Sequence, residues 1–380
     1  MPFAVRTADG WFWSSSTARP AKFVATFRTR EGLDAVVGDA NEVTLGRIFL
    51  DGGLDIQGNI FVLLSVAEYT LRHSEGLSSN LVQTIGRISL DAARRLMHGH
   101  KSGGAENWQC SPCPLELPAE FFEPWLGSFL AHCCAFFRSA EEDLDAAQLH
   151  AMENVCDRLA LEAGDHLLGV GCGWGSLLLY AAEHYGANVR GIASSETQVE
   201  TAEDRIRRSG LQWKCSVQRR DLRTSPYRAG SFDKILHVGV FEQAPFTDLG
   251  KYLVCMRDML VPEGLLLLDR MTCSHGFGTV ARPMHPALPV ESLSKELELA
   301  EAAGLELLNV ETLRKEYDRT LSVWIERLLT NWMRDIDGRF DRESRAWLFY
   351  LVEVAAGLRA EAIQVHRLLF RCSLRKASFD

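Results

Sequence analysis

HLLGVGCGWGSLLLYAAEHYG, residues 166–186, reads as a strand, a glycine turn and a helix in direct succession. His166–Val170 predicts a short apolar strand, and the next five residues, 171–175, include three glycines. Ser176–Tyr185 has helical character and is followed by Gly186, as is typical of a helix end. Because glycine has no Cβ, such a turn lets the backbone lie against a ligand while the first amides of the helix point outward. The segment therefore predicts a loop that binds a nucleotide-type ligand.

The glycine spacing of this turn indicates which ligand it holds. A dinucleotide-binding loop has the pattern G-x-G-x-x-G, with an acidic residue about 20 positions later. This chain has G-x-G-x-G, with Trp174 in the turn and Ser176 where the third dinucleotide glycine would fall. A pyrophosphate would fit poorly there, whereas the compact spacing suits S-adenosylmethionine, which carries no phosphate. A purely structural strand-to-helix turn is the alternative, because a short motif is only a hypothesis.

Composition and charge limit the classes of protein. The chain has 380 residues, of which 47% are hydrophobic and 24% are charged, so it can bury a full core and form two domains. A net charge of −9 argues against nucleic acid as a partner, since phosphate binding needs clustered Lys and Arg. Two local basic clusters are either solvated faces or contacts for anionic lipid headgroups. They are Arg205, Arg207 and Arg208 on a predicted helix, and Arg367, Arg371, Arg375 and Lys376 near the C-terminus.

Targeting signals and cysteine usage predict a cytoplasmic protein. The N-terminal sequence MPFAVRTADGWFW contains Arg6 and Asp9 and lacks a continuous apolar core, so no secretory signal is expected. The apolar stretch Asn59–Leu71 is too short to span a bilayer and contains Glu68. The ten cysteines are scattered, which suits reduced thiols. Any contact with the inner membrane surface is therefore expected to be peripheral.

Four residues between positions 98 and 113 could ligate zinc, namely His98, His100, Cys110 and Cys113. Structural zinc usually shows tighter paired spacing, so we expect no metal. The overlapping stretch KSGGAENWQCSPCP, residues 101–114, is instead interpreted as a polar linker. It would separate a small N-terminal domain, residues 1–105, from a larger domain, residues 115–380.

Strand and helix patterns alternate after this linker. Expected helices cover 146–159, 197–208 and 246–260, and expected strands cover 188–192, 215–219, 232–240 and 265–271. This alternation predicts a doubly wound α/β sheet, in which ligands bind at the carboxyl ends of the parallel strands. The glycine turn, residues 193–195, Asp221 and Glu242 are therefore expected to meet at one crevice.

A family resemblance rests on segments that recur in a fixed order. They are GCGWG with LYAAEHYGANVRGI, then SSETQ, FDKILHVGVFE, EGLLLLD, EYDRTLSVWIERL and RAEAIQVHRLLF. From about Leu115 to the C-terminus the chain resembles the cyclopropane-fatty-acyl-phospholipid synthase family, which includes the mycolic acid cyclopropane synthases. The stretch VTLGRIFLDGGLDIQGNIFVLLSV weakly resembles the family's small N-terminal domain, which is linked to handling the lipid. The resemblance implies an α/β class I S-adenosylmethionine methyltransferase fold, Rossmann-like and doubly wound, with a small N-terminal domain.

The resemblance also implies a cofactor site for S-adenosylmethionine. Ser and Gln side chains can hydrogen-bond to ribose or adenosine, and an aspartate can accept from the adenine amino group. For the two serines, capping of the following helix is the alternative role, and the aspartate could instead begin a turn. The corresponding residues are Gly171, Cys172, Gly173, Trp174, Gly175, Ser194, Ser195, Gln198, Asp221 and Leu222.

The family's reaction implies an acyl site with an anion. A methyl group moves from the sulfonium onto a cis double bond of a phospholipid acyl chain, a carbocation forms, and a bicarbonate ion removes a proton as the ring closes. The residues that hold the anion in the family correspond to Cys134, Glu242, Asp269 and Tyr317. Nearby aromatic residues either line the acyl channel, where they could stabilise the cation, or pack in the core. These are Phe136, Phe137, Phe241 and Trp324.

Some positions depart from the pattern that the resemblance implies. Asp269 stands in place of a histidine, and an ionised aspartate would repel bicarbonate. Either Asp269 is itself the general base, or proton removal is impaired. Gly169 stands in place of an acidic residue before the glycine turn, which implies weaker cofactor binding. Other departures are His132, Cys133 and Gln243.

Together these observations predict an S-adenosylmethionine-dependent C-methyltransferase. Its substrates would be unsaturated acyl chains of phospholipids at the membrane surface, and its product a cyclopropane ring or a methyl branch. Two other hypotheses remain open: a catalytically degenerate relative that binds lipid or cofactor, and a nicotinamide oxidoreductase. The resemblance further implies a homodimer.

Overall fold

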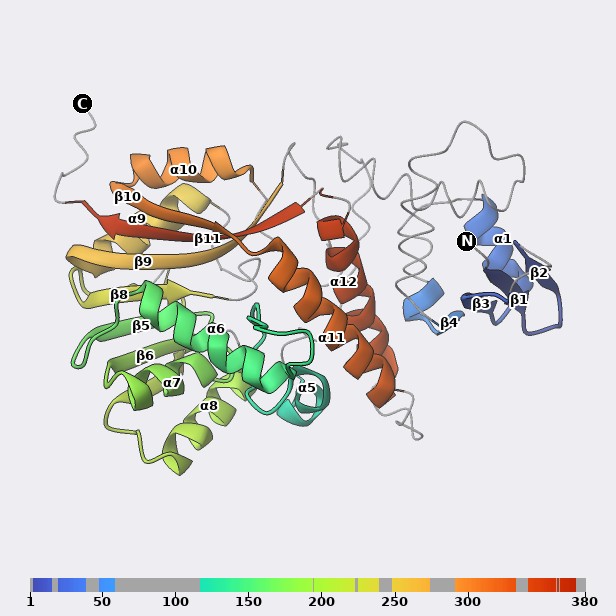
Figure 1. The fold of residues 1–380 in the computed structure, drawn as a ribbon, viewed down its shortest axis with the longest axis horizontal. Coiled ribbons are helices and arrows are strands. Elements are labelled where there is room, and N and C mark those ends of the chain that lie inside the picture. Colours follow the sequence, from blue (N-terminus) through green and yellow to red (C-terminus); the bar gives the residue numbers. More distant parts are fainter. Residues whose placement is uncertain are drawn as a thin grey trace. The chain divides into compact units, whose positions relative to one another are not determined.

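The structure, a computed structural model, describes the chain in two compact units (Figure 1). One unit comprises Met1–Gly103 with Trp332–Ala362, and the other comprises Gly104–Asn331 with Ile363–Asp380. The predicted domain limits at residues 105 and 115 lie outside the described residues and stay a prediction. The described residues are 3–15, 20–38, 48–58, 117–193, 195–222, 225–238, 248–273, 291–332, 341–359, 361 and 363–373.

The second unit is built on a seven-stranded sheet with the order β10-β11-β9-β8-β5-β6-β7. Neighbouring strands from β9 to β7 are parallel, whereas β11 is antiparallel to both β9 and β10. The predicted doubly wound α/β sheet is confirmed. The strands are β5 (His166–Val170), β6 (Asn188–Ala193), β7 (Cys215–Arg219), β8 (Phe232–His237), β9 (Leu260–Cys273), β10 (Leu305–Thr312) and β11 (Ile363–Cys372).

Helices cover both faces of this sheet because successive strand residues point to opposite sides. In β9, Leu266 and Leu268 belong to one buried apolar cluster and Leu267 to another. The first cluster includes residues of α9 and α10, and the second includes residues of α6, α7 and α8 (Figure 1). The helices are α5 (Ala119–Leu126), α6 (Leu144–Arg158), α7 (Ser176–His184), α8 (Glu196–Arg208), α9 (Leu249–Met259), α10 (Leu293–Ala302) and α11 (Arg314–Trp332).

The first unit contains a four-stranded sheet with the order β2-β1-β3-β4. Arg345 of α12 has a side chain that is 3% exposed, and it donates to the carbonyls of Phe49 and Leu54 and pairs with Asp55. This arginine therefore fastens α12 to the segment that leads into β4. The elements are β1 (Ala4–Thr7), β2 (Phe12–Ser14), β3 (Phe23–Phe27), α1 (Arg30–Gly38), β4 (Leu54–Gly58) and α12 (Asp341–Arg359).

None of the helices that the structure describes has the length and apolar character needed to cross a bilayer. The stretch Asn59–Leu71, which we discounted as a membrane span, lies outside the described residues.

Candidate functional site

The glycine turn joins β5 to α7 at the carboxyl edge of the parallel strands. Gly171, Gly173 and Gly175 have φ values of 68°, 55° and 84°, in the left-handed region that favours glycine. The amide of Cys172 donates to the carbonyl of Ile192 at 2.9 Å, which ties the turn to β6. Gly175 is the N-cap of α7. The turn is therefore a bare backbone loop held at the edge where ligands bind in parallel sheets.

The other residues predicted to bind the cofactor follow β6 and β7 at the same edge. Ser195 caps α8, because its hydroxyl accepts from the amide of Gln198 at 3.1 Å, and both side chains are buried. Asp221 begins a turn, since its carbonyl accepts from the amide of Ser225 at 2.9 Å, and Leu222 is buried. Both alternative roles weighed from the sequence thus occur in the structure. Ser194 lies outside the described residues.

Trp174 and Gly169 have neighbours that the sequence did not reveal. The Trp174 indole is 2% exposed and packs on Phe122 of α5, with ring centroids 4.7 Å apart. A Cβ at Gly169 would lie 2.5 Å from Cδ2 of Leu178, so an acidic side chain there would require Leu178 to move. Leu178 therefore fills the space beside Gly169 in this chain.

His237, the last residue of β8, is a site residue that sequence reasoning missed. Its Nδ1 lies 2.7 Å from the Tyr252 hydroxyl, and its Nε2 lies 3.0 Å from where a Cβ on Gly171 would stand. Burial, and secondarily Arg270, lowers the pKa of His237 to about 3, so the ring is neutral at pH 7. The only sequence signal was a polar residue where an apolar strand ends.

The buried imidazole predicts a pH dependence of stability. Because the pKa of His237 is about 3 in the folded protein and near 6.5 when unfolded, the unfolded chain takes up the proton first as the pH falls. The contribution of the neutral His237 ring to the free energy of unfolding is fully present above pH 6.5. Below pH 6.5 it declines by up to about 1.4 kcal/mol per pH unit, down to pH 3. Urea unfolding at several pH values should give a flatter profile for His237→Asn than for the wild type.

The matched control for this measurement is His166→Asn, since His166 has a side chain that is 64% exposed. Its profile should follow that of the wild type. Parallel profiles for His237→Asn and the wild type would contradict the assignment of a neutral buried ring.

The segment around Cys134 lies against α11, which carries Tyr317. The amide of Ala135 donates to the Thr320 hydroxyl at 3.0 Å, and Tyr317 lies one helical turn before Thr320. Cys134 and Tyr317 are 3% and 7% exposed. Burial raises the pKa of Cys134 well above its usual value, so its thiol is neutral. Two residues of the predicted anion site are thus brought to adjacent elements, whereas Glu242 lies outside the described residues.

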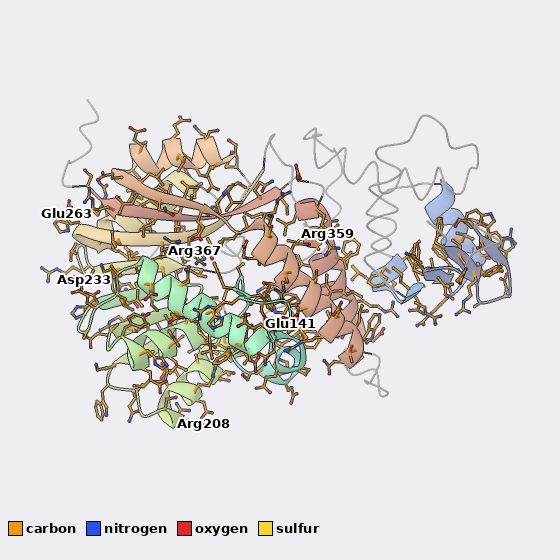
Figure 2. All side chains as sticks on the ribbon, in the orientation of Figure 1. Glu141, Arg208, Asp233, Glu263, Arg359 and Arg367 are labelled. Atoms are coloured by element: carbon orange, nitrogen blue, oxygen red, sulfur yellow. The ribbon has the colours of Figure 1, made fainter. Side chains whose placement is uncertain are left out.

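Asp269 forms an ion pair with Arg367, its partner in the register of β9 and β11. Arg367 is labelled in Figure 2. Nε and Nη2 of Arg367 donate to the two carboxylate oxygens at 2.7 and 2.8 Å, and Nη1 donates to Asn154 of α6 at 2.7 Å. Their side chains are 6% and 2% exposed. Burial, and then Asp269, raises the pKa of Cys133 to about 12. The Asp269–Arg367 pair, which has no net charge, therefore lies near Cys133 and Cys134, where a lone carboxylate was expected.

The residue after Asp269 forms a second buried ion pair. Arg270 donates from Nε to Glu296 of α10 at 2.8 Å, and the two side chains are 4% and 3% exposed. Since neighbouring strand residues point to opposite faces, β9 carries one buried ion pair on each face of the sheet.

Each basic cluster combines surface arginines with one that is turned inward, since Arg207 and Arg208 are exposed and Arg371 is half-exposed. Arg367 is buried, and Arg371 pairs with Glu306 at 2.6 Å, while Arg375 and Lys376 lie outside the described residues. Arg205 is turned toward the glycine turn, where it donates to the Trp174 carbonyl at 3.0 Å. As solvated arginines, Arg205 and Arg367 were therefore predicted wrongly.

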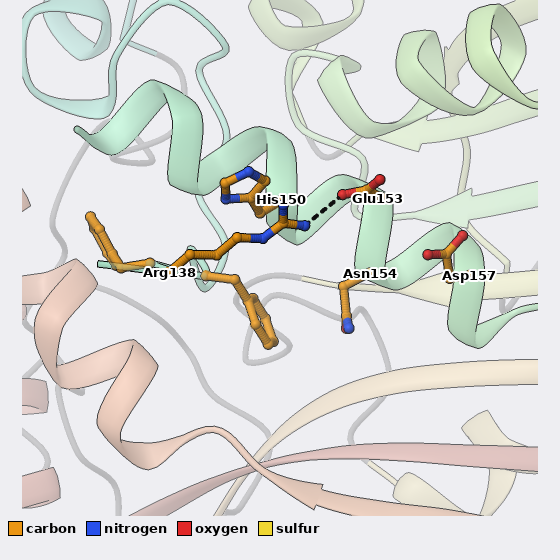
Figure 3. Close-up of a pocket in the computed structure, with 7 residues that line it drawn as sticks. Arg138, His150, Glu153, Asn154 and Asp157 are labelled. Carbon is orange, nitrogen blue, oxygen red and sulfur yellow. Dashed lines mark hydrogen bonds and ion pairs between the residues drawn. The ribbon is translucent and has the colours of Figure 1, made fainter. Parts of the chain in front are cut away.

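Aromatic residues near Cys134 fall into two groups. Phe136 and Phe137 line a pocket of about 290 Å³ beside α6, together with Arg138, His150, Glu153, Asn154 and Asp157 (Figure 3). Trp324 is fully buried instead and packs on Trp125 and His132, with centroids 6.2 and 5.0 Å apart. Phe241 and Gln243 lie outside the described residues, as do the four zinc candidates. Elsewhere in the described chain no cluster of metal-ligating side chains occurs.

Comparison with known proteins identifies relatives of this arrangement. The family model described as mycolic acid cyclopropane synthetase matches residues 114–368. The "Probable fatty acid methyltransferase" of Pseudomonas putida is 29% identical over 334 residues, which cover 86% of this chain and 81% of that one. The cyclopropane-fatty-acyl-phospholipid synthase of Escherichia coli K12 is 28% identical over 265 residues, covering 67% and 65%.

Solved structures show the same fold. The cyclopropane synthase MmaA2 from Mycobacterium tuberculosis has a TM-score of 0.62 at 23% identity, covering 68% of this chain and 95% of that one. The mycolic acid cyclopropane synthase CmaA1, solved with SAH and CTAB, also has a TM-score of 0.62, at 22% identity, covering 68% and 97%. The fold is that of the class I S-adenosylmethionine methyltransferases.

Proposed function

Since this chain belongs to the mycolic acid cyclopropane synthetase family of S-adenosylmethionine-dependent methyltransferases, we propose that it methylates the double bond of unsaturated acyl chains in phospholipids. The product is a cyclopropane ring or a methyl branch. The observation that carries the proposal is the turn of three left-handed glycines at the carboxyl edge of the sheet, with the Cys134 segment held beside it.

The glycine turn fits S-adenosylmethionine. A Cβ placed on Gly173 would meet no atom within 4 Å, so this part of the turn leaves open space for a ligand to approach the backbone. We assign the turn, Gln198 and Asp221 to the cofactor, through amide and side-chain hydrogen bonds. When bound, the cofactor supplies an electrophilic methyl group on a sulfonium.

The acyl side of the site combines aromatic side chains with a neutral thiol, a predicted carboxylate and a balanced ion pair. The thiol of Cys134 is neutral, and we assign Cys134, Tyr317 and Glu242 to a bicarbonate ion. Asp269 is not the general base in this proposal, because both of its oxygens already accept from Arg367. The charge of the pair is balanced, so the repulsion expected of a lone carboxylate is offset. Phe136, which lies against the Arg367 guanidinium at 5.3 Å, helps to exclude water.

The proposed substrate is presented at the inner membrane surface by peripheral contact, and the proposed assembly is a homodimer. A degenerate relative that binds cofactor without turnover is the alternative, motivated by Gly169 and Asp269. Calorimetry with S-adenosylmethionine, combined with product analysis, separates the two.

Lipid mass spectrometry of expressing cells tests the proposed function. Wild-type protein should add one CH2 to unsaturated acyl chains, and Glu242→Gln should lower this product by about 10²-fold or more, because it removes the charge of a predicted catalytic group. Arg208→Gln, at an exposed position of α8, is the control and should give wild-type product. No gain of CH2 on any chain would overturn the proposed activity, and equal product from Glu242→Gln would overturn the role of Glu242.

A further inference from the structure

Arg205 differs from the other arginines of α8. Arg207 and Arg208 are exposed and pair with Asp204 on the same helix. Nη1 of Arg205 points inward and lies within hydrogen-bond distance of three oxygens. These are the carbonyl of Phe129 at 3.2 Å, the carbonyl of Trp174 at 3.0 Å and the hydroxyl of Ser176 at 2.8 Å.

These three oxygens belong to two segments with different tasks in the proposed function. Trp174 and Ser176 lie in the glycine turn and at the start of α7. Phe129 lies in the irregular segment 127–135, which leads to Cys134. The Ser176 hydroxyl also donates to the Phe129 carbonyl, so the serine and the arginine meet at one acceptor.

The segment 127–135 is held by side chains in place of a regular ladder. Nε2 of Gln148 donates to the carbonyl of Ala131 at 3.0 Å, and Thr320 accepts from the amide of Ala135. Leu130 adopts a positive φ of 52°. Irregular backbone of this kind keeps one conformation only where surrounding groups fix it. At the end nearest the glycine turn, Arg205 holds the Phe129 carbonyl, and Asp145 accepts from the neighbouring Ser128 hydroxyl at 2.9 Å.

The hydrogen-bond partners of Arg205 are neutral oxygens. Burial lowers the pKa of its guanidinium, and the nearby Glu123 opposes this shift. A charge drawn inward without a bidentate carboxylate is costly. Its hydrogen bonds to carbonyls are charge-assisted and therefore stronger than neutral ones. The guanidinium of Arg205 therefore loses hydration, and its hydrogen bonds fix the segment 127–135 relative to the glycine turn.

We propose that Arg205 is a positioning residue that holds the segment 127–135 against the glycine turn, so that Cys134 and the cofactor keep one alignment. This inference rests on the proposed function for its catalytic consequence. Whether the segment 127–135 is held in place over the glycine turn can be measured without any substrate.

The test combines thiol labelling with cofactor binding. Cys133 and Cys134 lie in the segment, so maleimide labelling of these thiols, located by mass spectrometry, reports its release. In Arg205→Gln we expect labelling of both to rise about tenfold and the Kd for S-adenosylmethionine to rise about tenfold, as the loss of a charge-assisted hydrogen bond implies. Arg207→Gln removes the same charge two residues away and should leave both values unchanged.

Two milder variants keep the test decisive if Arg205→Gln does not fold. Ser176→Ala removes one oxygen of the cluster, and Arg205→Lys keeps the charge but loses the planar fork; both should shift labelling and Kd in the same direction, by about twofold to fivefold. Wild-type labelling in all three variants would overturn the proposal. If the wild-type protein makes no lipid product, increased labelling in the variants would still sustain the positioning role, while the proposed function would be contradicted.

Discussion

Replacing Arg367 with methionine is expected to lower the free energy of unfolding by about 3–5 kcal/mol, because it leaves a buried carboxylate without its partner. Asp269 is 6% exposed in its side chain, and both of its oxygens accept from Arg367. Methionine fills a similar volume, so the loss reports the unpaired charge more than a cavity. Urea unfolding of Arg367→Met beside the wild type measures it.

Two further variants separate the charge from the packing. The double variant Asp269→Leu with Arg367→Met removes both charges and should recover most of the lost stability. Arg371→Met lies on the same strand, and its ion pair with Glu306 is solvent-exposed, so it should cost little. A double variant as unstable as Arg367→Met alone would show that the pair is not the source of the loss.

Gly173→Ala is expected to weaken binding of S-adenosylmethionine by about 10²-fold, because its methyl group would enter the space left open above the turn. At a φ of 55°, alanine also pays a backbone cost of about 1–2 kcal/mol. Gly210, at φ 68° with open space around it, lies beyond the end of α8. Gly210→Ala should pay the same backbone cost and leave the Kd unchanged, as measured by titration calorimetry.

Gly171→Ala should behave differently from Gly173→Ala. Its Cβ would lie 3.0 Å from Nε2 of His237, so it adds a steric cost to the backbone strain and should be the less stable of the two in urea. Wild-type affinity in Gly173→Ala would mean that the cofactor does not approach this turn.

The parallel part of the sheet could be predicted from the sequence because its signals are local. β5 and β7 have the predicted bounds, since β5 is a short apolar run followed by a glycine and β7 alternates in burial along CSVQR. β9 (Leu260–Cys273) is longer than the predicted strand 265–271. The prediction was too short because Pro262 and Gly264 are residues that usually interrupt a strand. The structure absorbs them with a register shift against β8 and a positive φ of 64° at Glu263.

The candidate site was less predictable because its decisive contacts are distant in the chain. Asp269 meets Arg367 across 98 positions, so no local pattern could reveal that the carboxylate is paired. Arg205 looked like its exposed neighbours, since helical spacing does not show which charged side chain reaches a carbonyl of another segment. His237 was likewise hidden at the end of an apolar strand, because its neighbours Gly171 and Tyr252 come from other segments of the chain.

The two consecutive ion pairs on β9 also fix the register of this strand relative to its neighbours. Asp269 faces Arg367 on one side of the sheet, and Arg270 faces Glu296 on the other. Sliding β9 by one residue in one direction would place Arg270 opposite Arg367, and sliding it in the other direction would place Asp269 beside Glu296. Slippage in either direction would therefore bring like charges together. The consecutive residues Asp269 and Arg270 thus select a single register for β9, the strand to which the antiparallel strand β11 is paired.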